Sequence, residues 1–362
     1  MTLVGRLLVF GATLVAIVVV ARLSTHDLWP APGPPAVGDE YCGQPCNLFQ
    51  MVWVGDVMLG DAAQADLDRH GYTWPFDHVR PLLTANVVIG NAEAPITTRR
   101  QHYFPNERWH YNMQPAAAQA LADVGFTALG LSNNHTLDRG PEGLRDTLRH
   151  AREAGLRTFG GGMNVDEASA PLLIETPYGT VGVVGLSTAW NSGAVASTRR
   201  AGTIPFTDAE INRLKQAATA AGARWMVAYV HWGENYEELV PRQRTVAASF
   251  ARAGYDLVIG AHPHIAQEIE VVDGMPVLYS LGNFAFGSPG RFSEAMPGLG
   301  LVARTYLDGD GFHAIEFSCI VIDNDVVRYQ PRPCTETQAR GLMNRLGSAV
   351  TVRGSKGLLE WR

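Results

Sequence analysis

Asp, Glu, Asn and His side chains recur in this 362-residue sequence at the places where short apolar runs end. They are Asp56 after MVWVG, Asn91 and Glu93 after NVVIG, Asn133, Asn134 and His135 after TALGLS, His231 in MVAYVHW, His262 and His264 in LVIGAHPH, and Asn283 after VLYSLG. Oxygen ligands mixed with imidazole nitrogens suit a divalent transition metal, such as Mn²⁺, Fe or Zn²⁺, rather than Ca²⁺. With Glu93 central, these ligands suffice for two ions, and a two-metal site can activate water and stabilise charge on a phosphoryl or carbonyl oxygen.

Each of these motifs, taken alone, also has a purely structural explanation. Asp56 can belong to a turn or a helix cap, the Asn-Asn-His run can be a left-handed turn, and His231 can be a core histidine. The combination is more specific, because every side chain stands at the same end of its apolar run. Ligands of α/β sheets bind at the carboxyl ends of the strands. We therefore expect the side chains to meet at one edge of a parallel sheet.

A rhythm of helix, glycine and apolar strand begins at Gln50 and supplies the elements that must position these residues. It predicts helices over 114–124, 142–154, 207–221 and 246–253, each closed by a glycine and followed by a strand. Continuous apolar strands that alternate with helices indicate an α/β fold with both sheet faces covered. Segment 299–329 alternates without intervening helices and should add antiparallel strands to the sheet.

The N-terminal segment Leu7–Leu23 is almost wholly apolar. As a helix it would be about 25 Å long, the lower limit for a bilayer span. No small-residue cleavage site follows it, and it is apolar on all faces, unlike a core helix. We expect a single-pass signal anchor over 1–23 in the cell membrane, with the body extracytoplasmic. A Pro/Gly-rich linker over 24–49, a domain over 50–333 and a C-terminal tail over 334–362 would follow.

Four cysteines fit an exported chain: Cys42, Cys46, Cys319 and Cys334. They allow three pairings, of which we favour the local pairs Cys42–Cys46 and Cys319–Cys334. The C-x3-C spacing of the first pair could also bind a metal, but no second pair of ligands stands nearby. An oxidising compartment favours disulfides.

The acidic net charge argues against a nucleic-acid partner. Lys and Arg number 29 against 35 Asp and Glu, for a net charge of -6. Arginines are paired at Arg99–Arg100, at Arg199–Arg200 and at Arg242 with Arg244, all in predicted loops. Such pairs could bind the carboxylates of an anionic polymer bidentately. For any single pair, solvated loop charge is the simpler explanation.

Seven segments together resemble the CapA family of bacterial poly-γ-glutamate capsule synthesis proteins, which share the calcineurin-like metallophosphoesterase fold. They are GDVMLG (55–60), GNAEAPI (90–96), LSNNHTLDRGPEGLRDTL (131–148), GGGMN (160–164), YVHWGENYE (229–237), GAHPHIAQ (260–267) and YSLGNFAF (279–286). The resemblance covers roughly 51–287. It implies a four-layer α/β/β/α sandwich, a membrane anchor, an extracytoplasmic location and capsule synthase subunits as partners.

The resemblance also implies roles for single residues. It places one metal on Asp56 and His264, a second on Asn134, His231 and His262, a bridging carboxylate at Glu93, a general acid or oxyanion stabiliser at His135 and its orienting partner at Asp138. We further expect substrate contacts from Asn91, Asn133 and Asn283. One departure stands out: related phosphoesterases have Asp-x-His in the first motif, whereas this chain has Met58 in the histidine position. The first metal would therefore lose a nitrogen ligand.

Two functions follow as hypotheses. The chain is expected to act in the biosynthesis or export of a poly-γ-glutamate-like polymer, with a divalent-metal cleft as binding site. Alternatively, it is a metal-dependent hydrolase of phosphoesters or γ-glutamyl amides. A purely structural envelope protein would leave the histidines at the strand ends unexplained.

Overall fold

The computed structural model describes residue 41 and residues 47–188 and 192–361. The predicted anchor Leu7–Leu23 and the pair Cys42–Cys46 lie outside the described residues. Within the described ranges, no helix has both the length and the apolar character needed to cross a bilayer.

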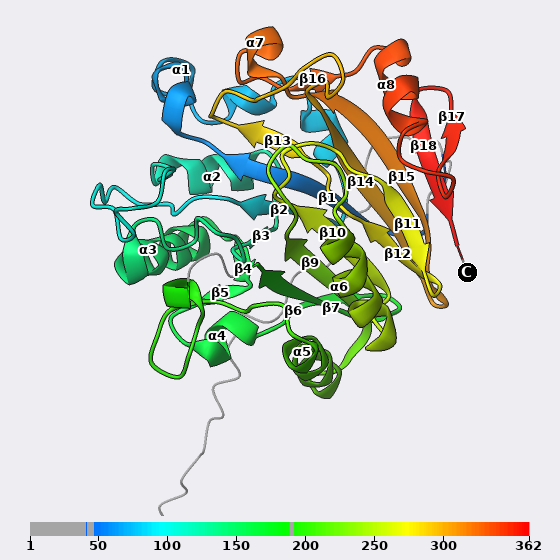
Figure 1. The fold of residues 1–362 in the computed structure, drawn as a ribbon, viewed down its shortest axis with the longest axis horizontal. Coiled ribbons are helices and arrows are strands. Elements are labelled where there is room, and N and C mark those ends of the chain that lie inside the picture. Colours follow the sequence, from blue (N-terminus) through cyan, green and yellow to red (C-terminus); the bar gives the residue numbers. More distant parts are fainter. Residues whose placement is uncertain (1–40, 42–46, 189–191, 362) are drawn as a thin grey trace, which may run out of the picture. The chain divides into compact units, whose positions relative to one another are not determined.

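Ten strands of the described chain form the first sheet (Figure 1). Along the sheet the order is β17 (Thr351–Arg353), β18 (Lys356–Glu360), β15 (Gly311–Val321), β14 (Leu299–Asp308), β1 (Phe49–Met58), β2 (Val87–Ala92), β3 (Ala128–Gly130) and β4 (Arg157–Phe159), with β13 (Asn283–Phe286) beside β1 and β16 (Arg332–Pro333) beside β15. Strands β13, β1, β2, β3 and β4 run parallel to one another. On the other side of β1, strands β14 and β15 continue the sheet antiparallel, as predicted for 299–329.

A second sheet contains six described strands. Their order is β11 (Ile269–Val272), β12 (Met275–Leu278), β10 (Leu257–Ala261), β9 (Ala223–His231), β7 (Gly179–Ser187) and β6 (Leu172–Thr176). The central strands β12, β10, β9 and β7 are parallel. Strands β5 (Gly161–Gly162) and β8 (Gly202–Thr203) form a separate two-stranded pair.

The helices lie between these strands in the chain. They are α1 (Gln64–His70), α2 (Ala116–Asp123), α3 (Gly140–Glu153), α4 (Val165–Ser169), α5 (Asp208–Ala220), α6 (Pro241–Arg252), α7 (Asn324–Val327) and α8 (Glu336–Met343), with short 3-10 turns η1 (Asp61–Ala63), η2 (Trp74–Phe76), η3 (Arg80–Leu83) and η4 (Ser192–Ala194). The Thr207 hydroxyl caps α5 by accepting the Glu210 N–H, as the capping box predicts. Helix α6 begins five residues before the predicted 246, at Pro241.

Alternation along the strands separates the three largest apolar cores of the described residues. In β1, Met51 and Trp53 face the second sheet and pack with its Val227 and Ile259. Their neighbours on the strand point to the opposite face, where α1, α2 and α3 cover the first sheet. Helices α5 and α6 cover the outer face of the second sheet in the same way. The mixed α/β fold with both sheet faces covered is confirmed.

Residues 334–361, within the segment 334–362 predicted as a tail, belong to the main body. Strand β18 pairs with β15, and α8 packs its buried side chains into the core between the sheets. The predicted disulfide Cys319–Cys334 is present and joins β15 to the segment before α8. Residues 324–327, expected as part of a strand, instead form α7, which the Asp323 side chain caps.

Candidate metal centre

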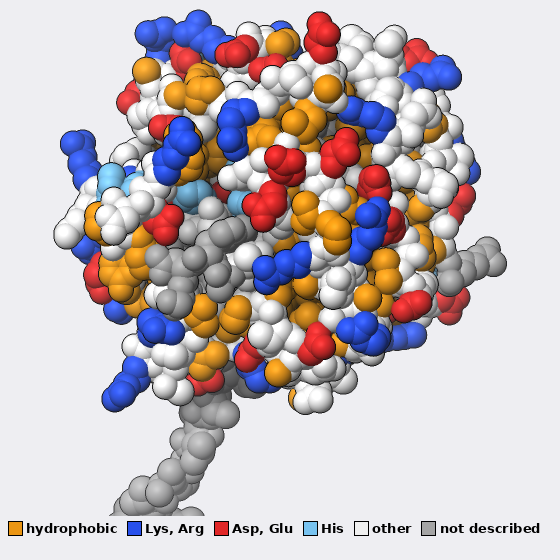
Figure 2. Space-filling view, viewed as in Figure 1, with side chains coloured by type: hydrophobic (Ala, Val, Ile, Leu, Met, Phe, Trp, Pro, Cys, Tyr) orange, Lys and Arg blue, Asp and Glu red, His pale blue; other side chains and the backbone are white. Residues whose placement is uncertain are grey.

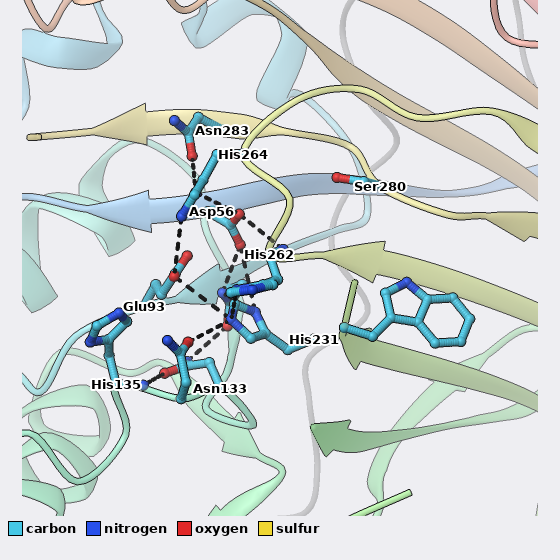
Figure 3. A network of polar contacts seen from close by, with 12 residues as sticks. Asp56, Glu93, Asn133, His135, His231, His262, His264, Ser280 and Asn283 are labelled. Atoms are coloured by element: carbon cyan, nitrogen blue, oxygen red, sulfur yellow. Dashed lines mark hydrogen bonds and ion pairs between the residues drawn. The ribbon is translucent and has the colours of Figure 1, made fainter. Parts of the chain in front are cut away.

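The carboxyl ends of parallel strands from both sheets meet at the candidate site. Asp56 lies near the end of β1, and Glu93 follows β2. From the second sheet, His231 is the last residue of β9, and His262 is the first residue after β10. The predicted convergence of these side chains at one edge is therefore observed (Figure 3).

The backbone beside these residues is unusually close and unusually bent. A Cβ on Gly55 would lie 1.7 Å from the Gly282 carbonyl oxygen, so only glycine lets the two segments approach here. His262 and His264 have φ values of 103° and 61°, a region that costs a non-glycine residue roughly 1–3 kcal/mol. The rest of the fold holds both histidines in this conformation, which is common at functional sites.

Two groups of buried side chains have the donor types and spacing to hold metal ions. One is Glu93, His262 and His264; the other is Asp56, Glu93 and His231. Within each group, the possible ligand atoms all lie within 4.8 Å of one another. Because Glu93 belongs to both groups, the arrangement is consistent with a binuclear site that shares one carboxylate.

Glu93 provides the test of whether a cation fits. Its side chain is fully buried, and neither carboxylate oxygen has a hydrogen-bond partner among the described residues. Burial, followed by the nearby charge of Asp56, raises the pKa of Glu93 well above its ordinary value. The nearest imidazole nitrogens, Nε2 of His231 and of His264, lie 3.7 and 3.8 Å from Glu93 Oε1, too far for a hydrogen bond. A buried carboxylate that accepts no hydrogen bond is unfavourable, and a divalent cation between Glu93 and the histidines would relieve it. The residues present therefore fit a metal.

His231 and His262 are in the protonation state that metal binding needs. Burial, with a contribution from the neighbouring imidazoles, holds the pKa of His231 and of His262 well below the usual range. Both rings are therefore neutral near pH 7 and offer nitrogen lone pairs. His231 Nε2 lies 2.8 Å from Asn134 Oδ1 and 3.1 Å from His262 Nδ1, so the three predicted ligands of the second metal are adjacent. Which residues serve which ion stays a prediction.

Buried asparagines support the ligands from behind. Asn91 Nδ2 donates to Asp56 Oδ1 at 2.8 Å, and Asn133 Nδ2 donates to Asn91 Oδ1 at 2.9 Å. Asn283 Oδ1 lies 2.8 Å from His264 Nδ1, so it can accept that N–H and leave Nε2 for a metal. Of these three predicted substrate contacts, only Asn133 lines the cavity described below. Met58, which stands where related phosphoesterases have a histidine, packs into the apolar core on the helix-covered face of the first sheet.

His135 and Asp138 form a pair at the cavity wall. His135 Nδ1 lies 2.8 Å from Asp138 Oδ2, which also accepts the Tyr111 N–H at 2.6 Å. The Tyr111 ring lies 4.5 Å from the imidazole. This arrangement fixes the ring of His135 and leaves its Nε2 for a ligand, as the predicted roles require.

A cavity of 470 Å³ lies over the centre and is lined by His135, His262 and His264. Histidine side chains are visible in a hollow of the surface whose rim carries charged and apolar side chains (Figure 2). The lining residues that sequence reasoning missed include Arg108, Tyr111, Tyr236 and Arg291. Tyr236 stands within the YVHWGENYE motif, but the loop residues Arg108 and Arg291 carry no pattern that would reveal them.

The arginine pairs singled out from the sequence lie elsewhere. None of the six residues is among those lining the cavity. Arg99 forms salt bridges with Asp146 and Glu142, and Arg244 does so with Glu268 and Glu270. The charges of Arg99 and Arg244 are therefore largely satisfied within the chain.

Two layered sheets whose parallel strands end at buried Asp, Glu and His side chains define an α/β protein with a candidate binuclear metal centre. The chain belongs to the family described as "Bacterial capsule synthesis protein PGA_cap", which its residues 50–288 match. The resemblance to CapA proteins noted in the sequence is thus confirmed.

Two relatives show how far the similarity extends. "Capsule biosynthesis protein CapA" of Bacillus anthracis is 31% identical over 316 residues, which are 85% of this chain and 74% of that protein. "PGA biosynthesis protein CapA" of Bacillus subtilis (strain 168) is 31% identical over 243 residues, 66% of this chain and 64% of that protein.

Solved structures with a similar arrangement are more distant. A phosphatase from Mycoplasma pneumoniae aligns with a TM-score of 0.45 and 15% identity, over 76% of this chain and 95% of that one. A calcineurin-like phosphoesterase from Bacillus subtilis aligns with a TM-score of 0.41 and 12% identity, over 72% of this chain and 85% of that one.

Proposed function

We propose that this protein acts in the biosynthesis or export of poly-γ-glutamate and that its buried centre binds two divalent metal ions beneath a polymer-binding cavity. The family and the named relatives support the polymer. The observation that carries the metal is Glu93, a fully buried carboxylate without a hydrogen-bond partner that both ligand groups share.

The donor set suits Mn, Fe or Zn, with ligands from Asp56, Glu93, Asn134, His231, His262 and His264. When bound, such ions supply Lewis acidity that polarises a carbonyl or phosphoryl oxygen. The chain's own residues orient the site. Asn283 holds the ring of His264, and Asn91 holds the carboxylate of Asp56. We assign both asparagines to positioning the ligands, because they hydrogen-bond to Asp56 and His264 and do not line the cavity.

Metal analysis tests this proposal. The full-length chain, purified in mild detergent and incubated with Mn, Fe or Zn, should retain close to two equivalents after gel filtration. His264→Ala should lose at least one of them. The matched control is His70→Ala, because His70 is exposed on α1 and takes no part in the centre. A wild-type chain that retains no metal would refute the proposed centre.

A second candidate function is metal-dependent hydrolysis of a phosphoester or a γ-glutamyl amide. The His135–Asp138 pair favours it, since a fixed imidazole at a cavity wall can donate a proton to a leaving group. In the metal-loaded chain, His135→Asn should lower kcat by about 10²–10⁴ without changing metal content. If the metal-loaded wild type cleaves neither kind of bond, the hydrolase is rejected and the polymer-handling role remains.

We also propose that Leu7–Leu23 anchors the protein in the cell membrane with its body outside the cytoplasm. Its length and its apolar character on all faces support this. An alkaline phosphatase fusion after residue 49 should be active in the intact cell, whereas a cytoplasmic body would leave it inactive. An intact mass that includes residues 1–23 would show that the anchor is retained.

A further inference from the structure

We infer that Arg108 and Arg291, at the rim of the cavity, bind the free carboxylates of the polymer and so determine its specificity. This inference rests on the proposed function, because it names the groups that would recognise an anionic chain at the same site. Both residues line the cavity, and both side chains are exposed. Among the described residues, neither forms a salt bridge with a carboxylate.

Arg291 is tied to the metal centre by one aromatic ring. Its guanidinium carbon lies 4.4 Å from the centroid of the Tyr236 ring, and that ring lies 5.4 Å from the ring of His264. The Tyr236 N–H donates to the Pro263 carbonyl oxygen at 2.9 Å, which fixes the tyrosine to the His-Pro-His loop. A carboxylate bound by Arg291 would therefore sit beside the candidate metal ligands.

Arg108 repeats the arrangement on another part of the cavity lining. Its guanidinium carbon lies 4.9 Å from the centroid of the Trp109 ring, and Trp109 also lines the cavity. Trp109 is 48% exposed, which is unusual for so large an apolar side chain. An exposed aromatic residue beside an unpaired cation is a common composition for a binding surface.

Stacking explains why these two arginines suit a carboxylate. A guanidinium group that rests on an aromatic ring uses its face for the contact. Its N–H groups point outward in the plane of the group and remain available for two parallel hydrogen bonds to a carboxylate. Arg244, by contrast, already donates to Glu268 and Glu270 and has little left to offer a ligand.

The cavity also carries negative charge, which limits where on its rim a carboxylate can bind. Glu107 and Glu234 also line it. Their negative charge disfavours carboxylates elsewhere on the rim, so anionic groups should bind at the two arginines. A chain of regularly spaced carboxylates joined by neutral amides matches this pattern better than one continuous patch of negative charge would. Removing the charge of Glu234 should then strengthen binding.

The test is the affinity of the full-length chain for a short synthetic γ-linked glutamate oligomer, measured by calorimetry, with metal content determined in parallel. Arg108→Gln and Arg291→Gln should each weaken binding about threefold to tenfold, and the double variant by about the product of the two. Glu234→Gln should strengthen it. The matched control, Arg244→Gln, removes the same charge outside the cavity and should leave the affinity unchanged. The same oligomer with its free carboxylates amidated, and inorganic phosphate as a second probe, should both bind more weakly than the acid form.

The outcomes separate this inference from the proposed metal centre. Equal affinities for the wild type and the double variant, equal weakening by Arg244→Gln, or full affinity for the amidated oligomer would overturn it. Failure of the wild type to bind the oligomer would also overturn it, whatever the metal content. Arginine-dependent binding by a chain without metal would uphold the inference and refute the metal centre instead. Phosphate that binds as tightly as the oligomer would overturn the preference for carboxylates.

Discussion

A carboxylate removed from water needs a compensating partner, because desolvation of the charge costs several kcal/mol. Glu93 is such a carboxylate, and the groups around it include the neutral His231 and His262 and a second acid, Asp56. Without a cation, the cluster destabilises the fold that holds it. Glu93 therefore lowers the stability of the metal-free fold, as functional residues often do, and its neighbours suit the binding of metal.

Glu93→Gln tests whether Glu93 binds metal at the expense of stability. The variant keeps the shape of the side chain and removes the buried charge, so we expect metal content to fall from near two equivalents to below one. In the presence of EDTA, the variant should be more stable than the wild type, by about 1–3 kcal/mol. Elemental analysis and urea unfolding with EDTA would measure the two effects. A variant that binds metal normally would contradict the shared role of Glu93.

At the residue scale, the sequence predicts which buried side chains converge, whereas it predicts the residues around them poorly. Asp56, Glu93 and the histidines could be found because strand ends converge on an edge, whatever the details of packing. Arg108 and Arg291 could not, because they lie in loops whose course depends on tertiary contacts rather than on any period. The acidic partners of Arg99 and Arg244 could not be predicted for the same reason, because only the fold brings them together.

Among the elements, β9 ends at His231, and the loop after β10 carries His262 and His264. The pairing of the two strands is fixed at the opposite end by Asp256. The Asp256 N–H donates to the Met226 carbonyl oxygen, and Asp256 Oδ2 accepts the Met226 N–H at 2.7 Å. Burial raises the pKa of Asp256, although the Met226 N–H and Lys215 oppose the shift. The aspartate thus aligns the strands at an electrostatic cost.

Asp256→Asn should keep the alignment and remove that cost. The amide oxygen can still accept the Met226 N–H, so we expect the free energy of unfolding at pH 7 to be unchanged or higher by up to about 1 kcal/mol. In the wild type, the raised folded-state pKa favours the protonated acid. Its contribution is full below the ordinary pKa of 3.8 and is lost as pH rises through the raised value.

Urea unfolding of both proteins between about pH 4 and pH 7 would check this dependence. The stability of the wild type relative to the variant should fall as pH rises across that interval. A difference that grows with pH would show that the charge of Asp256 helps the fold.

Helices and strands themselves were largely predictable, because glycines end the helices and apolar runs fill the strands. The boundaries that failed had tertiary causes. Helix α6 starts early at Pro241, which is well suited to a first helical turn. Residues 334–361 join the main sheet through β18. No pattern within that last segment indicates that β15 offers it a free edge.

For the whole molecule, the essential property is that neither sheet holds the centre alone. Asp56 and Glu93 come from the first sheet, and the three histidines come from the second. The hydroxyl of Tyr229 in β9 also donates to the Val54 carbonyl oxygen in β1, so the sheets are joined by a polar contact near the site. Metal binding should therefore stabilise both sheets together.

Removal of metal should lower the stability of both sheets at the same time. We expect EDTA to lower the free energy of unfolding by about 2.7 kcal/mol for each ion removed, relative to metal at a hundredfold excess over its dissociation constant. Hydrogen exchange measured by mass spectrometry should speed up in β1 and β2 as well as in β9 and β10. If exchange changes in one sheet only, the ion is held by one side of the centre.

The size of the cavity sets a limit on what the protein can sense. A space of 470 Å³ is that of a pocket for a small molecule, so it admits only a few consecutive units of any long chain. The remainder must trail outside, where the cavity walls make no contact with it. Under the proposed function, this cavity would distinguish one monomer from another, but its walls could not count the units that lie beyond it, so the length of the polymer would have to be set elsewhere.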